Sequence, residues 1–374
     1  MENRISSQQV AFLTFLLMLG SAFVAVPEAT AGRNAWVSSI LAALIGFYAL
    51  AVILRLQLMF PGVSIFKIAE LSLGLVPGKI LNMVYLFIVW VVAILYLGDI
   101  ISLLRQLFPL LPAFSLRTII ILTAVCCLYK GITSIAYLAE LVIGFIIFFL
   151  VIGFLAPLSL ADFSNLQPIL SEWYAMAGAT LYGAVWPYLE ITVFALLLPL
   201  VNDLEKGYPK IVTWFIIAAV VLVFRTVLVL AVLGPELTLA YAFPFYKVFR
   251  LVEVQNFQRI ELFFFAMWFT TSFIAGLVYY LGVVLGLKEL FGLKDYRSLI
   301  LPVGLLILTM SIYTIRSDMY FVRVLSTNAP LVTMPVNLLY PTIVLLAALI
   351  AYNKVRDKLA PPSNAAEQSM EFQE

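Results

Sequence analysis

Residues 19–28 of this chain read LGSAFVAVPE, and residues 182–190 read YGAVWPYLE. Each stretch lies within a long apolar run and places a glycine before a proline. Glycine weakens a helix, and proline removes one of its hydrogen bonds. At membrane depth, the backbone groups that such an interruption frees persist only where protein or a water-filled cavity satisfies them. The two stretches therefore predict two interrupted membrane helices.

The composition places the rest of the chain in lipid as well. Of the 374 residues, 64% are hydrophobic and 11% are charged, whereas about 25% are charged in an ordinary soluble domain. A membrane span needs about 20 mostly apolar residues, and long unbroken apolar runs favour helices over barrel strands. We expect an all-α membrane protein with ten spans, at residues 10–31, 36–60, 80–108, 116–129, 132–158, 173–200, 211–233, 261–287, 298–315 and 336–352.

The ten spans divide into two sets of five, which makes the two interrupted helices, spans one and six, equivalent. Interrupted helices at corresponding positions of two halves point to a substrate site near the middle of the membrane. The alternative is that glycine and proline serve close packing, since both are common in membrane helices. We expect residues 1–358 to form one transmembrane domain and residues 359–374 a polar, disordered tail.

Lysine and arginine indicate the orientation of the chain. They are more numerous in the segments that would be cytoplasmic if the N-terminus were inside. Because cytoplasmic loops carry an excess of these residues, we expect both termini on the cytoplasmic side. The segment 61–78 predicts an amphipathic helix at the inner interface, and the aromatic segment 235–258 is expected to pack over the outer face.

Two charged residues fall deep within spans, where an unpaired charge is costly. Glu190 follows the second interruption, and Arg225 lies inside span seven. We expect them to pair, either as a structural ion pair that locks spans six and seven or as a charge that sets the conformation of the broken helix. Glu28, Asp99 and Glu140 lie nearer the predicted span ends, and we expect them to reach water, polar groups, or Arg33 and Arg105.

The sequence offers little for catalysis. It contains no histidine, and its net charge is only +2. It also lacks phosphate-loop, nucleophile-elbow and metal-ligand motifs. We therefore expect no catalytic residues, no metal site, no cofactor and no nucleic-acid partner.

Several short motifs carry a family resemblance. They are Ile5-Ser6 with Gln9, Gly20 to Pro27, Gly32-Arg33-Asn34-Ala35-Trp36, Pro187-Tyr188-Leu189-Glu190, Pro199, Asn202, Arg259-Ile260-Glu261, Trp268 and Gly286-Leu287-Lys288. Together they resemble the spore germination receptor B-subunit family, the endospore germination permeases of the amino acid–polyamine–organocation transporter superfamily. One position departs from it, because members often have glycine where this chain has Leu189.

The resemblance implies a five-plus-five inverted repeat with a central site lined by spans one, three, six and eight. It also implies nutrient sensing in the inner membrane of a bacterial spore, with an A subunit and a C subunit as partners. On this basis we expect the ligand to contact Gly20, Ser21, Ala22, Phe23, Trp90, Ile94, Gly183, Trp186, Pro187, Ala275 and Tyr279. Helix packing is the alternative explanation for the residues of spans three and eight.

Three functions remain open from the sequence. The leading hypothesis is a sensing subunit in which a small nutrient, such as an amino acid, binds between the broken helices and signals to the partner subunits. The first alternative is a secondary transporter that moves an amino acid, with or without coupled Na⁺ or H⁺. The second is a scaffold that assembles the partners without binding a ligand.

Overall fold

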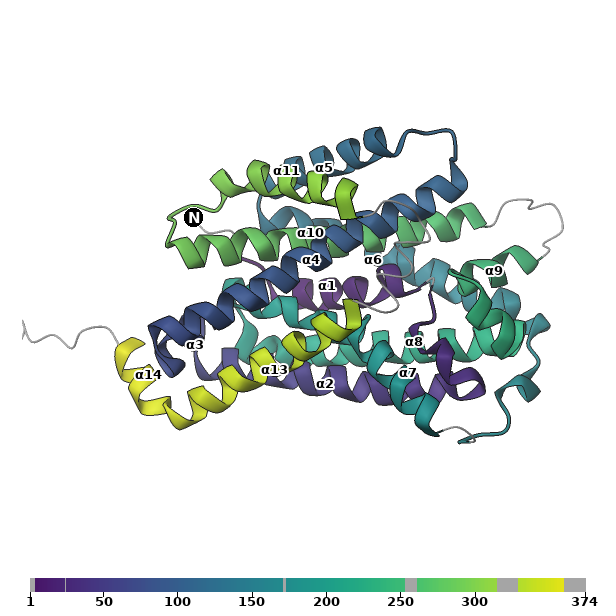
Figure 1. Ribbon diagram of the computed structural model, residues 1–374, viewed down its shortest axis with the longest axis horizontal. Helices are drawn as coiled ribbons and strands as arrows, with labels where there is room; N and C mark the ends of the chain where they lie inside the picture. Colours follow the sequence, from purple (N-terminus) through teal and green to yellow (C-terminus); the bar gives the residue numbers. More distant parts are fainter. Residues whose placement is uncertain (1–3, 24, 171–172, 253–260, 315–328, 360–374) are drawn as a thin grey trace, which may run out of the picture.

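The structure of the chain is a computed structural model that describes residues 4–23, 25–170, 173–252, 261–314 and 329–359. Within this part the chain is almost entirely helical, and the long helices run side by side along the longest axis of the molecule (Figure 1). Large apolar side chains such as Leu110, Leu141 and Ile350 are exposed on the outside of this bundle. An apolar exterior of this kind suits a lipid environment.

Ten helices correspond to the ten predicted spans. They are α1 (Ser7–Leu19), α2 (Ala35–Met59), α4 (Leu75–Leu107), α5 (Ala113–Tyr129), α6 (Ile132–Leu155), α7 (Trp173–Val185), α8 (Leu204–Ala240), α10 (Glu261–Phe291), α11 (Arg297–Thr314) and α13 (Ala329–Ile350). Eight of these stretches are long and apolar enough to cross a membrane, and α1 and α5 are shorter apolar helices. The all-α membrane fold is thus confirmed, and α1 is short because its span is interrupted.

Both predicted interruptions are present. Helix α1 ends at Leu19, Gly20 departs from helical geometry (φ −17°, ψ −125°), and the chain continues as two 3₁₀ segments, η1 (Ser21–Phe23) and η2 (Pro27–Asn34). Helix α7 ends at Val185, and a 3₁₀ segment, η5 (Tyr188–Leu196), follows Pro187. The glycine and proline signals therefore predicted the two breaks correctly.

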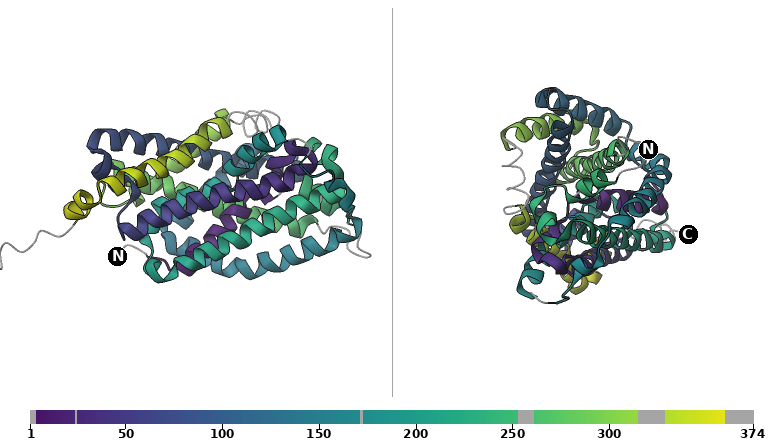
Figure 2. Two further views of the ribbon diagram at one scale, coloured as in Figure 1. Left: turned by 90° about the horizontal axis from the view of Figure 1, so that it is seen from below. Right: turned by 90° about the vertical axis from the view of Figure 1, so that its right-hand side faces the viewer.

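The helices pack in pairs that relate the two halves of the chain. The first helix of each half packs against the second helix of the other, so α1 contacts α8 and α2 contacts α7. Likewise α4 contacts α10, and α5 contacts α11, which are the third and fourth helices of each half. Figure 2 shows α2 running beside α8. These reciprocal contacts are those of a five-plus-five inverted repeat.

Short helices lie at both ends of the bundle. The predicted amphipathic segment contains α3 (Ile65–Leu73), which buries Phe66 and exposes Lys67. The aromatic segment contains α9 (Pro244–Leu251), whose Phe245 packs against Phe23 with ring centroids 4.9 Å apart. Helix α14 (Tyr352–Leu359) packs on α3, and residues 360–374 of the predicted tail lie outside the described residues.

The start of α1 is tied to the end of the second broken span. Ser6 caps α1, because its hydroxyl accepts a hydrogen bond from the Gln9 amide (3.2 Å) and its own amide donates to the Gln9 side chain (2.9 Å). The Ile5 amide donates to the Leu200 carbonyl (3.1 Å), and the Asn202 amide donates to the Ile5 carbonyl (3.0 Å). The N-terminal motif therefore joins the two broken spans at the end of the bundle where α3 and α14 lie.

Candidate functional site

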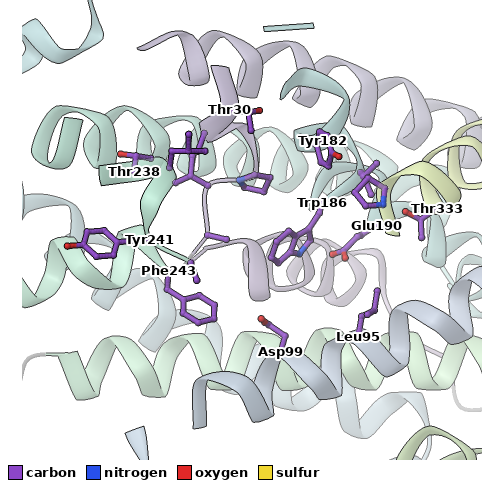
Figure 3. A pocket seen from close by; sticks show the side chains of 18 of the residues that line it. Thr30, Leu95, Asp99, Tyr182, Trp186, Glu190, Thr238, Tyr241, Phe243 and Thr333 are labelled. Atoms are coloured by element: carbon purple, nitrogen blue, oxygen red, sulfur yellow. The ribbon is translucent and has the colours of Figure 1, made fainter. Parts of the chain in front are cut away.

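A cavity of about 420 Å³ lies between the two helix breaks (Figure 3). Its walls come from the first break, α4, the second break, the end of α8 with the segment that follows it, and α13. The lining residues are Ala25, Val26, Pro27, Ala29, Thr30, Val92, Leu95, Tyr96, Asp99, Tyr182, Val185, Trp186, Glu190, Thr238, Leu239, Ala240, Tyr241, Ala242, Phe243, Pro330, Thr333 and Asn337. A cavity of this volume falls within the range of small-molecule sites, roughly 300–1,000 Å³.

The cavity lies in one half of the bundle. Its lining residues on α4 and α8 come from the C-terminal parts of these helices, and those on α13 come from its N-terminal part. Helix α3 packs on α4 and α13, and α14 packs on α3. The cavity is therefore displaced away from the end of the bundle that carries α3, α14 and the start of α1.

The first break is held by a buried ion pair. The Arg225 guanidinium of α8 lies 3.9 Å from the Glu28 carboxylate of η2, and both side chains are fully buried. Arg225 also donates a hydrogen bond to the Ala25 carbonyl, which the interruption has freed from helical bonding. Arg225 thus provides a hydrogen bond to one carbonyl of the unwound backbone and balances the charge of the nearest acidic side chain. Such compensation is what a broken membrane helix requires.

The second break leaves space for that ion pair. A Cβ atom on Gly183 of α7 would lie 2.6 Å from the Glu28 Cγ atom, so this position accepts no larger side chain without a shift of Glu28. After the break, the Tyr188 hydroxyl lies 3.1 Å from the Ser39 hydroxyl of α2. The glycine in the second motif therefore allows the first break to pack closely against α7.

Two carboxylates line the cavity, Asp99 on α4 and Glu190 on η5. The Tyr96 hydroxyl donates a hydrogen bond to the Glu190 carboxylate, and the Tyr279 hydroxyl of α10 donates to the Glu190 carbonyl (3.1 Å). Asp99 is only 2% exposed, and neither of its carboxylate oxygens has a hydrogen-bond partner within the described part of the chain.

The structure separates most of the predicted ligand residues from the cavity. Of the eleven predicted ligand residues, Trp186 alone is in the described lining of the cavity. Gly20 lies next to the cavity lining, because a Cβ atom on Gly20 would be 3.3 Å from the hydroxyl of the lining residue Tyr96. The same Cβ atom would be 3.3 Å from the Ala275 Cβ atom. Tyr279 adjoins the cavity through Glu190.

The remaining predicted residues have packing contacts or lie farther along the helices. Phe23 belongs to an aromatic cluster with Phe154, Phe245 and Phe264. Ala22 and Ile94 are buried, Trp90 is half-buried next to Phe87, and Pro187 precedes η5. The Ser21 side chain lies outside the described residues, as do Arg259 and Ile260 of the family motif.

The predicted partner of Arg225 is wrong. Arg225 pairs with Glu28, whereas Glu190 is bonded to Tyr96 and Tyr279. Glu28 and Asp99 are both buried rather than exposed near span ends. Glu28 reaches a polar group, as expected, but that group is Arg225 and neither Arg33 nor Arg105. The η2 segment turns Glu28 inward toward α8, and Asp99 lies two helical turns before the end of α4 at Leu107.

The sequence-based prediction missed two walls of the cavity. One is the run from Thr238 to Phe243, which was assigned to an outer loop, and the other is the first turns of α13, with Pro330 and Thr333. The acidic residue inside the apolar run of α4 is the signal that could have pointed to the site, since an ionisable residue within a span is a functional candidate by default.

The fold and the cavity define a multi-pass membrane protein with the inverted-repeat architecture of permeases and transporters. The family model described as "Spore germination protein" matches residues 4–319. The chain therefore belongs to the spore germination protein family, that of the germinant receptor B subunits.

Curated relatives agree with this assignment along most of the chain. Spore germination protein KB of Bacillus subtilis (strain 168) is 24% identical over 356 residues, which cover 92% of this chain and 95% of the relative. Spore germination protein A2 of the same organism is 22% identical over 310 residues, covering 79% of this chain and 83% of the relative.

A solved structure shares the fold. It is Mhp1, a nucleobase-cation-symport-1 family transporter in a closed conformation with bromovinylhydantoin bound, and it aligns with a TM-score of 0.61 over 86% of this chain and 75% of its own. The sequence identity is 14%, so the likeness concerns the fold alone. It agrees with the reciprocal helix contacts described above.

Proposed function

We propose that this chain is the nutrient-sensing membrane subunit of a spore germinant receptor and that the cavity between the helix breaks binds the nutrient. The observation that carries the proposal is the position of the cavity, which has the first break, the second break and α4 as walls. An amino acid is the proposed ligand class, because a cavity of about 420 Å³ with both apolar and carboxylate walls suits a small polar molecule.

Binding at this place can change the conformation of the subunit. A ligand shifts an equilibrium between two conformations only by its difference in affinity for them. The cavity walls belong to both halves of the repeat, so a change in their separation alters the contacts that a bound nutrient makes. In this proposal the ligand favours one arrangement of the halves, and the A and C subunits receive that change.

The proposed location is the inner membrane of the spore, with both termini in the cytoplasm. Lys67, Lys288 and Arg356 lie on or next to helices at the end of the bundle that carries α3 and α14, and a cytoplasmic face is rich in such residues. With this orientation the cavity lies in the outer half of the membrane, where a nutrient arrives from outside.

The test is a dose–response curve for germination. Spores carry this chain with its A and C subunits as their only receptor, and a panel of amino acids is screened first. Val92→Phe adds volume inside the cavity, and Val84→Phe makes the same change on the exposed side of α4, where Val84 is 46% exposed. We expect the half-maximal nutrient concentration to rise at least about tenfold for Val92→Phe, since filling a site costs its contacts.

The control variant and immunoblots of all subunits show whether a changed response comes from the cavity or from altered subunit abundance. Val84→Phe is expected to respond like the unmodified receptor, with equal amounts of all subunits in both strains. A normal response of Val92→Phe at normal abundance would remove the cavity as the sensing site and favour a scaffold that assembles its partners.

A secondary transporter is the second candidate, favoured by the fold shared with a symporter. In that case vesicles containing this chain alone accumulate a labelled amino acid, and Val92→Phe lowers the accumulation. Equal label in vesicles with and without the chain, together with an intact germination response, would leave sensing as the function.

A further inference from the structure

Asp99 is a buried acid without a hydrogen-bond partner in the part of the chain that the structure describes. Its side chain is 2% exposed and its two oxygens lack hydrogen-bond partners among the described residues. Figure 3 shows it on α4, with its side chain directed into the cavity on the side facing Trp186. An unpaired carboxylate within a membrane span is costly, so Asp99 would be stabilised by a bound partner that the described residues do not supply.

The charged residues in the described lining of the cavity all have the same sign. Its described lining contains Asp99 and Glu190 and neither lysine nor arginine. The nearby Glu28 charge is matched by Arg225, and the Glu190 carboxylate accepts the Tyr96 hydrogen bond. A bound group of positive charge is therefore the complement that this wall lacks.

The aromatic residues of the lining suit an organic cation. The aromatic side chains of Tyr182, Trp186 and Tyr241 belong to the lining, and Trp186 lies across the cavity from Asp99 (Figure 3). Aromatic faces attract ammonium groups, and more strongly where water is excluded. A small metal cation prefers several oxygen ligands instead, and no group of three acidic or other metal-binding side chains occurs in the described chain.

We infer that Asp99 is the anchor for an ammonium group and that the cavity selects ligands carrying one, amino acids or simple amines, over neutral molecules of similar size. This inference rests on the proposed function, because it assumes that the cavity is the ligand site. The ammonium group lies between the Asp99 carboxylate and the Trp186 ring, with the rest of the ligand toward the apolar residues of α4.

The first test needs no variant. The purified full-length chain in lipid nanodiscs is heated in the presence of L-alanine, L-valine, ethylamine, isobutylamine, the N-acetyl derivatives of both amino acids, or D-glucose. Acetylation removes the positive charge and keeps the carbon skeleton. We expect the compounds that keep the ammonium group to stabilise the chain against heat. The acetylated compounds should need an at least tenfold higher concentration for half-maximal stabilisation.

The second test changes the anchor. Asp99→Asn keeps the shape of the side chain and removes its charge, and Glu140→Gln makes the analogous change at an exposed position on α6. We expect the apparent affinity for the ammonium compounds to fall at least tenfold in Asp99→Asn and to stay unchanged in Glu140→Gln. Asp99→Glu, which keeps the charge, is expected to retain preference for the ammonium form.

The outcomes separate this inference from the proposed function. If D-glucose or the acetylated compounds bind as well as the amines, and Val92→Phe abolishes that binding, the cavity is the ligand site and the ammonium anchor is refuted. Equal affinities of Asp99→Asn and the unmodified chain for the amines would also refute the anchor. If Val92→Phe leaves the binding of every probe unchanged, the cavity assignment itself fails.

Discussion

Removal of the buried ion pair between Glu28 and Arg225 should destabilise this fold strongly. Glu28→Gln and Arg225→Gln each remove one charge and leave the other in a site with no exposed surface. Breaking a buried pair by removing one partner typically costs about 3–5 kcal/mol. Arg225→Gln should be the more damaging change, because it also removes the hydrogen bond to the Ala25 carbonyl.

The distance gives the size of the coupling. At the observed separation of 3.9 Å, two unit charges attract by about 4 kcal/mol with an effective dielectric constant of about 20 and by about 1 kcal/mol in water. The chain supplies a matched control. Arg297 and Asp295 are also 3.9 Å apart, but their side chains are 46% and 57% exposed, and exposed pairs contribute about 0–1 kcal/mol.

The measurement is a double-mutant cycle on the free energy of unfolding. The purified chain is unfolded by SDS in mixed micelles and followed by tryptophan fluorescence for both single variants and the double variant. We expect a coupling of several kcal/mol for Glu28 with Arg225 and less than about 1 kcal/mol for Arg297→Gln with Asp295→Asn. Equal coupling in the two cycles, or additive losses at Glu28 and Arg225, would refute the assignment of this pair as the restraint on the first break.

The remaining predictions concern the second break. Gly183→Ala places a Cβ atom 2.6 Å from the Glu28 Cγ atom, whereas Gly178 on the same helix has open space around it. We expect Gly183→Ala to destabilise the chain by about 1–3 kcal/mol and Gly178→Ala to stabilise it by up to about 1 kcal/mol, and equal unfolding midpoints for the two variants would contradict this packing. Tyr279→Phe removes the 3.1 Å hydrogen bond to the Glu190 carbonyl and should cost about 1–3 kcal/mol, and an unchanged unfolding free energy would show that this bond is not needed.

The breaks could be predicted because their cause is local. A glycine or a proline changes the backbone wherever it stands, so residues 19–28 and 182–190 identify the interruptions without knowledge of the neighbours. The partner of Arg225 could not be found in this way. It depends on how the η2 segment turns after Val26 and on the space that Gly183 leaves on another helix, and both are consequences of three-dimensional packing.

The missed walls of the cavity have a similar origin. Helix α8 was expected to end before Pro235, yet Gly234 adopts a left-handed conformation (φ +74°) and helical structure continues to Ala240. Helix α13 was expected to begin after Pro335, but it begins at Ala329 and contains that proline. Neighbouring helices and side chains can satisfy the backbone groups that a proline frees in a membrane helix. The prolines were therefore poor predictors of the end of α8 and the start of α13.

The two acidic residues near the first break have different roles because of what the second half of the chain places beside them. Glu28 receives a cation from α8 and is part of the restraint on the unwound segment. Asp99 receives none from the described residues and lines the cavity. A ligand bound there under the proposed function contacts α4 of the first half and the broken helix of the second half simultaneously. Since only contacts that differ between two conformations shift their balance, this shared wall is where ligand charge can be converted into a movement of one half against the other.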